Sequence, residues 1–348
     1  MSNKLTIIQP DDWHVHFREG EMLKAIANIP SKFNKRCIAM PNTNIPITNS
    51  EQVLKYRGQI YENVLNDNFE VLIPCYLNEN INLKDFKHAL INNFFIGGKL
   101  YPIDVTNNSS FGISKIENIF PLLEILEEEK KILLIHGEKT ADEVKIFDRE
   151  KYFIDQDLKI ITNKFKNLKI VLEHVSSAYG VDCVKSNKNM AGTITPHHML
   201  LTKKDLFNND LLDPFHFCMP VVKDEKDLVA LRDAACKDNN NFFVGTDSAP
   251  HHINDKKPNF STKPGIFSSF CSIELYAKIF EEEKSINSLE KFLSINGPNF
   301  YNLPLNKNLI NLEKIEWTVP EFLEYNSIKV KNFYGNKKIN WKVTGLKV

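Results

Sequence analysis

Short apolar segments alternate with longer amphipathic segments along most of the chain. The apolar segments are rich in Ile, Val, Leu and Phe, which predicts buried strands. They cover residues 5–17, 36–42, 69–77, 94–102, 131–138, 168–175, 192–198 and 241–250. Apolar residues at helical spacing predict helices over residues 50–65, 114–131, 148–165 and 224–237. Strands that alternate with helices are typical of parallel βαβ units.

The number of these units favours one architecture over another. About eight strand–helix units in one run favour a (β/α)8 TIM barrel, an α/β fold, although a doubly wound open sheet would show the same alternation. The segment from about residue 302 to 348 has little helical period and contains short strand-like runs. We therefore expect one domain over residues 1–348, with residues 302–348 as an appendage packed on the barrel.

Composition and charge narrow the class of protein. The 348 residues include 44 Lys and Arg against 44 Asp and Glu, so the formal net charge is zero. A neutral protein has no basic field to attract nucleic acid or an anionic membrane surface. No apolar run approaches the roughly 18 residues of a spanning helix, and proline and acidic residues interrupt the N-terminal segment too early for a secretory signal. We expect a cytoplasmic protein without nucleic-acid or membrane partners.

The spacing of the six cysteines also favours a cytoplasmic location. They are widely scattered, with no Cys-x-x-Cys pair and no spacing typical of a disulfide framework. We expect reduced cysteines in or near the core.

Polar residues end many of the predicted strands. In a barrel, the C-terminal ends of all strands meet at one mouth, where active sites are built. The residues at these ends are His14, His16, Asn42, Lys99, His136, His174 and Asp247. His14 and His16 are two apart on one strand, so both imidazoles face the same side. Alone, the pair is compatible with chance, but together with the other histidines and Asp247 it indicates zinc or a similar divalent metal.

Lys99 is the unexpected member of this set. An ammonium group among metal ions is repelled, so it must lose its proton or be converted. Carboxylation by carbon dioxide gives a carbamate anion whose two oxygens can bridge two metals. From spacing alone, a lysine that extends to solvent at the barrel rim is the simpler interpretation.

Seven motifs occur in an order that resembles a known family. They are DDWHVHFREG, MPNTN, GGKLYP, LLIHGE, VLEHVSS, TITPHHML and GTDSAPH. In this order they resemble the bacterial dihydroorotases of the shorter type, members of the metal-dependent amidohydrolase superfamily, over about residues 5–301. The C-terminal segment carries little of the resemblance.

The resemblance implies a binuclear zinc site. His14 and His16 would bind the more buried zinc, completed by Asp247, and His136 and His174 would bind the second. Lys99, as N6-carboxylysine formed with carbon dioxide, would bridge the two ions. A hydroxide held between zinc ions is a nucleophile at neutral pH. Asp247 would take its proton and pass it to the departing ring nitrogen, first as general base and then as general acid.

The implied enzyme is a cyclic amide hydrolase with a small-molecule substrate. It would interconvert N-carbamoyl-L-aspartate and L-dihydroorotate, with loss of water on ring closure, in de novo pyrimidine (UMP) biosynthesis. A homodimer is also expected from the family.

Substrate selection requires a site for the free carboxylate. If the extended backbone continues past His16, Arg18 faces the same mouth, and its guanidinium can bind a carboxylate bidentately. A solvated surface arginine is the alternative. By resemblance, Arg18, Asn42 and His251 match the carboxylate-binding positions. Met219 and Pro264 match positions that contact the ring; Met219 replaces the usual leucine, which should matter little because backbone groups make that contact.

Residues 101–114 resemble a lid that closes over the substrate. Thr106 matches one lid threonine of the family. Asn107 stands where the usual pattern has a second threonine, but its amide can still donate a hydrogen bond, so we expect closure with altered kinetics.

The remaining histidines have simpler interpretations. We expect structural or rim positions for His88, His197, His198, His216 and His252, because adjacent residues on a strand point to opposite faces and the family does not use them as ligands.

Two other functions compete with a dihydroorotase. Hydantoinases and allantoinases share the metal ligands, but Arg18 with Asn42 and the short chain favour a dihydroorotase. A non-catalytic scaffold built on the same barrel would be expected to have lost metal ligands, whereas every ligand position in this chain is filled.

Overall fold

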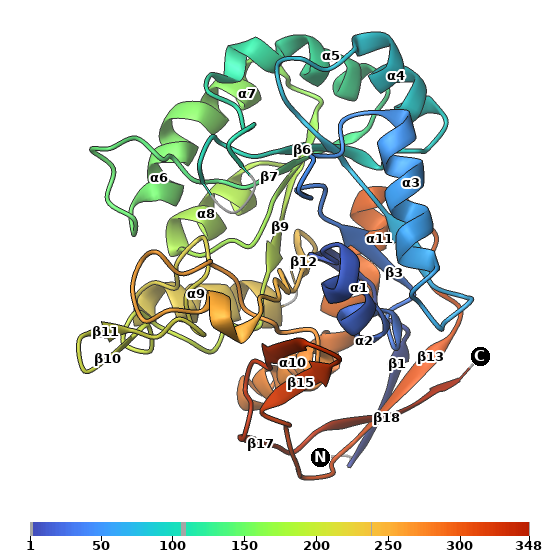
Figure 1. Ribbon diagram of the computed structural model, residues 1–348, viewed down its shortest axis with the longest axis vertical. Helices are drawn as coiled ribbons and strands as arrows, with labels where there is room; N and C mark the ends of the chain where they lie inside the picture. The colour runs from blue at the N-terminus through green and yellow to red at the C-terminus, as the bar shows by residue number, and fades with distance from the viewer. Residues whose placement is uncertain (1–2, 106–108, 238, 348) are drawn as a thin grey trace.

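A computed structural model describes residues 3–105, 109–237 and 239–347, and its centre is a barrel of parallel strands surrounded by helices (Figure 1). The barrel strands are β2 (Asp12–Val15), β3 (Arg36–Ala39), β4 (Glu70–Leu72), β5 (Cys75–Tyr76), β6 (Gly97–Leu100), β7 (Ile132–Ile135), β8 (Lys169–Leu172), β9 (Met190–Ile194) and β12 (Phe242–Val244). Their residues are almost all buried, as expected of strands that are covered on both faces.

The parallel strands form two sheets that close on each other. One sheet has the order β2-β3-β4 and the other the order β12-β9-β8-β7-β6-β5. β4 and β5 are consecutive parts of one strand, interrupted at Pro74, which has no N–H to donate to a neighbouring strand. β12 then meets β2 through a parallel bridge between Val15 and Ser248, and Asp247 N donates to His14 O over 2.9 Å. The predicted (β/α)8 barrel is therefore confirmed.

A buried carboxylate fixes this closing seam. Asp12 lies on β2, and its side chain accepts hydrogen bonds from the backbone N–H of Thr246 at 2.9 Å and from the Thr246 hydroxyl at 2.7 Å. The contact joins β2 to the chain beyond β12, directly below His14 and Asp247. A charged residue inside the barrel thus aligns two strands that carry candidate site residues.

Helices cover the outside of the barrel. They are α1 (Gly20–Ile26), α2 (Asn28–Ser31), α3 (Ser50–Tyr61), α4 (Leu83–Ile91), α5 (Phe120–Glu128), α6 (Arg149–Phe153), α7 (Lys159–Lys164), α8 (Ala178–Ser186), α9 (Glu225–Cys236), α10 (Ser272–Glu282) and α11 (Asn296–Tyr301). Short helical turns are η1 (Ile116–Ile119), η2 (Ile154–Leu158), η3 (Ile253–Asp255), η4 (Ile286–Ser288) and η5 (Lys291–Ile295). The four predicted helical segments correspond to α3, to η1 with α5, to α6 through α7, and to α9.

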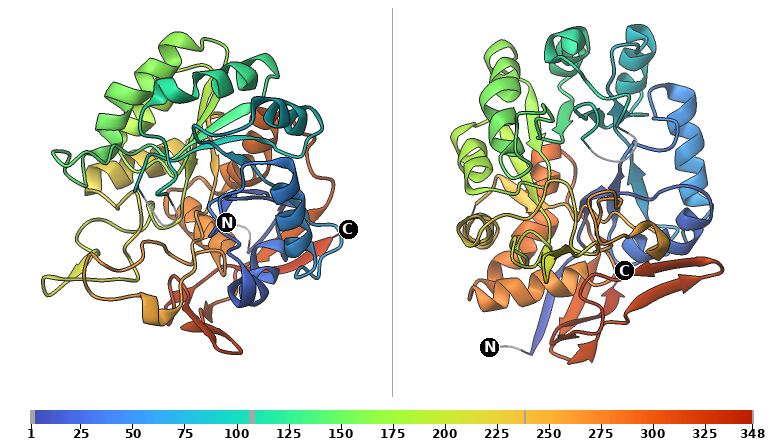
Figure 2. Two further views of the ribbon diagram at one scale, coloured as in Figure 1. Left: turned by 45° about the horizontal axis from the view of Figure 1, so that its top comes forward. Right: turned by 60° about the vertical axis from the view of Figure 1, so that its left-hand side comes forward.

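The first apolar segment, residues 5–17, contains two strands where the sequence pattern predicts one. β1 (Lys4–Ile8) ends before Pro10 and lies outside the barrel, where it pairs antiparallel with β13 (Leu309–Glu313). β13 also pairs with β18 (Lys342–Lys347), so the first and last strands flank one C-terminal strand. Figure 2 shows these C-terminal strands, in red, gathered on one side of the barrel.

The other strands form short antiparallel pairs. They are β10 (Phe207–Asn208) with β11 (Leu211–Leu212), β15 (Phe322–Tyr325) with β16 (Ile328–Lys331), and β14 (Trp317–Thr318) with β17 (Lys338–Ile339), which enclose β15 and β16 in the chain.

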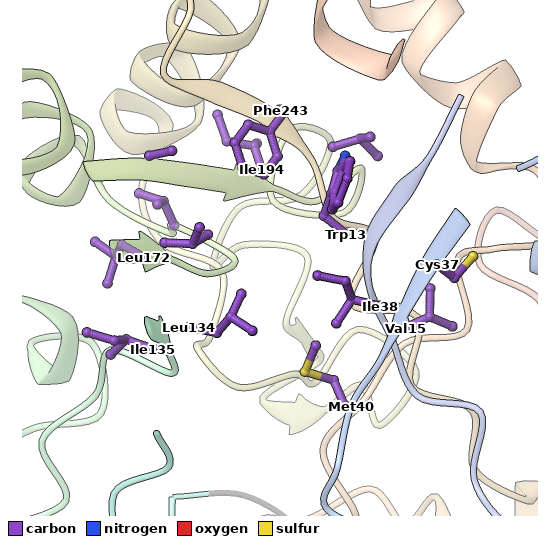
Figure 3. Packing of buried hydrophobic residues seen from close by; sticks show 14 of the residues in the cluster. Trp13, Val15, Cys37, Ile38, Met40, Leu134, Ile135, Leu172, Ile194 and Phe243 are labelled. Atoms are coloured by element: carbon purple, nitrogen blue, oxygen red, sulfur yellow. The ribbon is translucent and has the colours of Figure 1, made fainter. Parts of the chain in front are cut away.

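The core joins side chains from strands all around the barrel (Figure 3). Trp13 of β2 turns away from the two histidines beside it and stacks on Tyr301 with ring centroids 4.3 Å apart. Gly297 of α11 makes this possible, because a Cβ there would lie 2.0 Å from Trp13 Nε1. Packing of Trp13 on α11 therefore fixes the strand that carries His14 and His16.

A buried ion pair connects the barrel to the C-terminal segment. The Arg36 guanidinium donates to both oxygens of Asp11, at 2.9 and 2.8 Å. Its Nη2 also donates to Asn306 Oδ1 at 2.8 Å and to Pro304 O at 3.0 Å. Both members of the pair are buried, so each depends on the other for its charge.

No helix within the described residues has the length and apolarity needed to cross a membrane. All six cysteines are free and five are buried, the exception being the half-buried Cys183.

Candidate metal centre and substrate pocket

All six predicted metal ligands lie at the C-terminal ends of barrel strands, and each is buried. His14 is in β2 and Lys99 is in β6, whereas the others follow a strand within three residues: His16 after β2, His136 after β7, His174 after β8 and Asp247 after β12. Their convergence follows from the parallel barrel, in which these ends meet at one mouth.

Three of these residues converge on one point. Nε2 of His14 and Nε2 of His16 lie 3.2 and 3.1 Å from the same oxygen, Oδ1 of Asp247. The ligand atoms of a tetrahedral zinc ion, each about 2.0–2.2 Å from the metal, lie about 3.3 Å apart. Two imidazoles and a carboxylate at this separation therefore fit a zinc ion.

The far nitrogens of the two histidines have different partners. Nδ1 of His14 lies 3.0 Å from Oε1 of Glu173, and Nδ1 of His16 lies 3.0 Å from Oδ1 of Asn42. An acceptor at Nδ1 keeps the proton on that nitrogen and leaves the Nε2 lone pair for a metal. The acceptor beside Nδ1 of His16 thus gives this imidazole the orientation and tautomer that a metal ligand needs.

The second group consists of His136, His174 and Lys99. The rings of His136 and His174 have centroids 4.5 Å apart, and the His174 ring is 5.1 Å from that of His14. Nε2 of His136 lies 2.7 Å from Oε2 of Glu138. In the described part of the chain, Nδ1 of His174 is buried without a hydrogen-bond partner, which a metal ion would satisfy.

Lys99 is buried inside the barrel, not at its rim. Its Nζ forms an ion pair with Oε2 of Glu173 and lies 4.5 Å from the centre of the Tyr101 ring. Burial lowers the pKa of Lys99 although Glu173 opposes the change. Burial thus makes the ammonium group easier to deprotonate, and it is the deprotonated amine that reacts with carbon dioxide. The interpretation as a lysine that reaches solvent is wrong for this fold.

Gly97 lets β6 bring Lys99 this close to its neighbours. A Cβ at Gly97 would lie 2.2 Å from the carbonyl oxygen of Ile132 in β7. The Gly-Gly pair of the motif GGKLYP therefore serves close strand approach directly before the lysine.

The charges of the centre are strongly coupled. Burial would lower the pKa of His14, but the carboxylates of Glu173 and Asp247 raise it to about 9. Burial would raise the pKa of Asp247, but His14 and His16 hold it well below its usual range. Burial lowers the pKa of His16 to about 4 and, together with neighbouring His136, that of His174 well below normal. Asp247 is therefore ionised and His16 and His174 are neutral, whereas His14 carries a second proton that a bound metal ion would displace.

Three residues of the site have left-handed backbone conformations. The φ angles are +60° at Arg18, +41° at His174 and +44° at Asp247. None is a glycine, so each conformation is unfavourable and is maintained by surrounding structure. At Asp247 the backbone N–H bond to His14 O provides part of that support.

Arg18 lies beside the metal ligands, but not on extended backbone as predicted. β2 ends at Val15, and the chain turns at Arg18. Its Nε donates to Pro250 O at 3.1 Å, and its Nη2 lies 3.0 Å from Nε2 of His251. Burial and the Arg18 charge lower the pKa of His251 well below normal, and the same Nε2 also lies 3.0 Å from Pro264 O.

One cavity joins the predicted metal ligands to predicted substrate contacts. Its lining includes His14, His16, His136, His174 and Asp247 together with Arg18, Asn42, Met219, Pro264 and Tyr101. A second hollow outside it shares His16, Arg18 and Asn42 and adds His251. The predicted lid residues Thr106 and Asn107 lie outside the described residues.

Sequence analysis missed two residues of the centre. Glu173 contacts both His14 and Lys99, and its only sign in the sequence is a charge within the apolar run VLEHV. Burial would raise the pKa of Glu173, but Lys99 and His14 lower it to about 2. Tyr101 lines the cavity, and its buried hydroxyl has no hydrogen-bond partner among the described residues.

His197 and His198 do not obey the alternation expected of a strand, because they follow β9 in a turn. Both are buried, with ring centroids 4.8 Å apart. His198 contacts Thr195 Oγ1 at 2.8 Å and Pro220 O at 2.9 Å, so it holds two loops together. His88 and His216 have backbone or side-chain partners at the surface, and His252 lies 3.2 Å from Ser327 O.

Comparison with known sequences identifies close relatives. The dihydroorotase of Aliivibrio fischeri is 40% identical over 340 residues, which are 97% of this chain and 99% of the relative. The dihydroorotase of Buchnera aphidicola is 38% identical over 343 residues, 98% of each chain. No family model matches the chain.

Comparison with solved structures identifies the same family. The crystal structure of Saccharomyces cerevisiae dihydroorotase in complex with 5-fluoroorotic acid matches with a TM-score of 0.91 and 29% identity over 98% of both chains. Dihydroorotase of Campylobacter jejuni matches with a TM-score of 0.90 and 30% identity over 99% of this chain and 98% of that one. L-Hydantoinase of Arthrobacter aurescens, at 13% identity and a TM-score of 0.79 over 98% of this chain and 83% of that one, shares the fold alone.

Proposed function

Since the chain belongs to the dihydroorotase family, cyclic amide hydrolases of pyrimidine biosynthesis, we propose that it interconverts N-carbamoyl-L-aspartate and L-dihydroorotate at two zinc ions in the barrel mouth. One observation carries the proposal: the convergent donors of His14, His16 and Asp247 share a cavity with Arg18. Metal ligands and a carboxylate-binding cation in one cavity match a cyclic amide that carries a carboxylate.

The proposed metal centre uses the residues at the strand ends. His14, His16 and Asp247 would hold one zinc ion, His136 and His174 would hold the other, and Lys99 would contribute to both sites as a carbamate. The carbamate forms when the neutral Lys99 nitrogen bonds to the carbon of carbon dioxide and releases a proton. When bound, the zinc ions supply a hydroxide nucleophile and polarise the amide carbonyl. The chemistry of the donor set supports zinc, because neutral imidazoles and carboxylate oxygen are its usual ligands.

The protein's own groups bind the substrate and move one proton. Arg18, Asn42 and His251 bind the carboxylate, while Met219 and Pro264 contact the ring. In ring opening, Asp247 takes a proton from the attacking oxygen and delivers it to the ring nitrogen as the C–N bond breaks. Ring closure reverses these steps. The yeast dihydroorotase complex with 5-fluoroorotic acid supports a pyrimidine carboxylate as the ligand of this cavity.

The proposal extends to the surroundings of the site. Residues 1–348 act as one domain, with residues 302–348 as its appendage.

Free cysteines support a cytoplasmic location, and zero net charge supports the lack of a nucleic-acid partner. A homodimer rests on the family resemblance and is tested by light scattering of the purified protein.

Metal analysis combined with an absorbance assay tests the function. We expect close to two zinc ions per chain, together with turnover in both directions. Ring closure consumes one proton, so the equilibrium ratio of ring to open form falls about tenfold for each unit of rising pH. Mildly acidic pH therefore favours closure, and higher pH favours opening. Zinc-loaded protein that leaves both compounds unchanged would refute the substrate assignment.

A further inference from the structure

Glu173 joins two of the predicted metal ligands from a third strand. It follows β8, while His14 belongs to β2 and Lys99 to β6. Oε1 of Glu173 lies 3.0 Å from Nδ1 of His14, and Oε2 forms the ion pair with Nζ of Lys99. The Glu173 side chain is fully buried inside the barrel.

Glu173 has a carboxylate oxygen near His14 and His174, as a metal ligand would, but its other contacts favour a supporting role. Its two oxygens are each directed to a different side chain, His14 and Lys99. It approaches His14 from Nδ1, whereas Nε2 of the same ring faces Asp247. Glu173 therefore lies on the far side of the imidazole from the point where the first metal fits.

The side chains beside Nδ1 of His14 and Nδ1 of His16 differ in charge. His16 has the neutral amide oxygen of Asn42 at its Nδ1, where His14 has a carboxylate. A carboxylate acceptor fixes the tautomer more strongly than an amide and makes the opposite nitrogen a stronger donor to a metal. The Nδ1 atoms of the two ligands on one strand thus face groups of different charge, a carboxylate at His14 and a neutral amide at His16.

We propose that Glu173 is a positioning residue of the metal centre, which orients His14 for the metal and Lys99 for carboxylation. This inference rests on the proposed function. A carbamate nitrogen retains one N–H, so Glu173 can accept from Lys99 both before and after carboxylation. That hydrogen bond fixes the rotation of the Lys99 side chain about its final bonds. Glu173 is not among the residues that line the substrate cavity, and it acts through His14 and Lys99.

The substitution Glu173→Gln tests this role, because it preserves size and removes the charge. Glu274→Gln is the matched control: Glu274 is also buried and accepts a backbone N–H from Val343 at 3.2 Å, but it belongs to α10. Apo proteins are titrated with zinc in competition with a chromophoric chelator. We expect Glu173→Gln to weaken zinc binding about 10–100-fold, and Glu274→Gln to change it less than threefold.

A second measurement reports on Lys99 without activity. With ¹³C-labelled bicarbonate, the lysine carbamate gives its own carbon NMR resonance. We expect this resonance in the wild type and in Glu274→Gln, and a strongly reduced intensity in Glu173→Gln at equal zinc. Circular dichroism of the apo proteins establishes that all three chains are folded.

The outcomes separate this inference from the proposed function. A wild type without zinc binding or dihydroorotate turnover refutes the function itself. A functional wild type with folded Glu173→Gln that matches it in zinc affinity and carbamate intensity overturns the positioning role. Complete loss of one zinc ion at every zinc concentration also overturns it, because Glu173 would then be a ligand. If the Gln variant fails to fold, Glu173→Asp decides: its shorter side chain cannot reach both partners, and unchanged zinc affinity overturns the inference.

Discussion

The Arg18 guanidinium offers the sharpest quantitative prediction about substrate binding. A guanidinium has five N–H donors. Over the ranges that the structure describes, Arg18 uses Nε–H for Pro250 O, and its Nη2 lies 3.0 Å from Nε2 of His251. Its remaining donors are available to a ligand in the cavity that it lines with Asn42.

The expected magnitude follows from the hydrogen bonds lost in Arg18→Met. A bidentate carboxylate contact contains two charge-assisted hydrogen bonds, each worth about 1.5–3 kcal/mol. Losing both weakens transition-state binding by about 3–6 kcal/mol, which corresponds to roughly 10²–10⁴-fold in kcat/KM. Arg18→Lys keeps the charge without the planar fork, so we expect a smaller loss than for methionine.

Comparison of two substrates isolates the carboxylate contact. Ring opening of L-dihydroorotate is measured beside that of dihydrouracil, which has the same ring without the carboxylate. Arg18→Met should lower kcat/KM for dihydroorotate by the amount above and change that for dihydrouracil less than threefold. Equal losses on both substrates would show that Arg18 only maintains the loop around Pro250, and the reasoning would fail.

Three further predictions concern the metal centre and the stability of the barrel. Lys99→Ala should abolish activity, with partial rescue by short carboxylic acids that replace the carbamate; full activity without added acid would contradict the carbamate. Asp247→Asn should reduce kcat by about 10²–10⁴-fold through lost proton transfer, with a smaller effect on zinc content, and near-normal turnover would refute its role as base. Arg36→Met leaves the buried carboxylate of Asp11 without its cation, so the free energy of unfolding in urea should fall by about 3–5 kcal/mol; a loss below about 1 kcal/mol would contradict this account.

The positions of the candidate ligands were predictable because they depend on local sequence and one topological rule. His136 and His174 follow apolar runs directly, and a parallel barrel brings the ends of such runs together without any knowledge of side-chain contacts. The same rule places Lys99 and Asp247 in the centre.

The partners of these residues were not predictable from the sequence. Whether Glu173 contacts His14 and Lys99 depends on the width and stagger of the barrel, which set distances between strands far apart in the chain. Arg18 shows a second limit: the sequence pattern predicts extended backbone, but β2 ends at Val15 and the turn that follows depends on contacts with Pro250 and His251. The division of the first apolar segment at Pro10 was easier to predict from the sequence, because proline ends strand pairing.

The left-handed backbone at Arg18, His174 and Asp247 has a consequence for engineering this chain. Glycine at such a position relieves an unfavourable conformation of the order of 1–3 kcal/mol, which offsets part of the stability lost with the side chain. Each replacement deletes a group assigned to metal, substrate or proton transfer. Relief of backbone strain and retention of turnover therefore conflict at these three positions, so a screen for melting temperature needs an activity assay beside it.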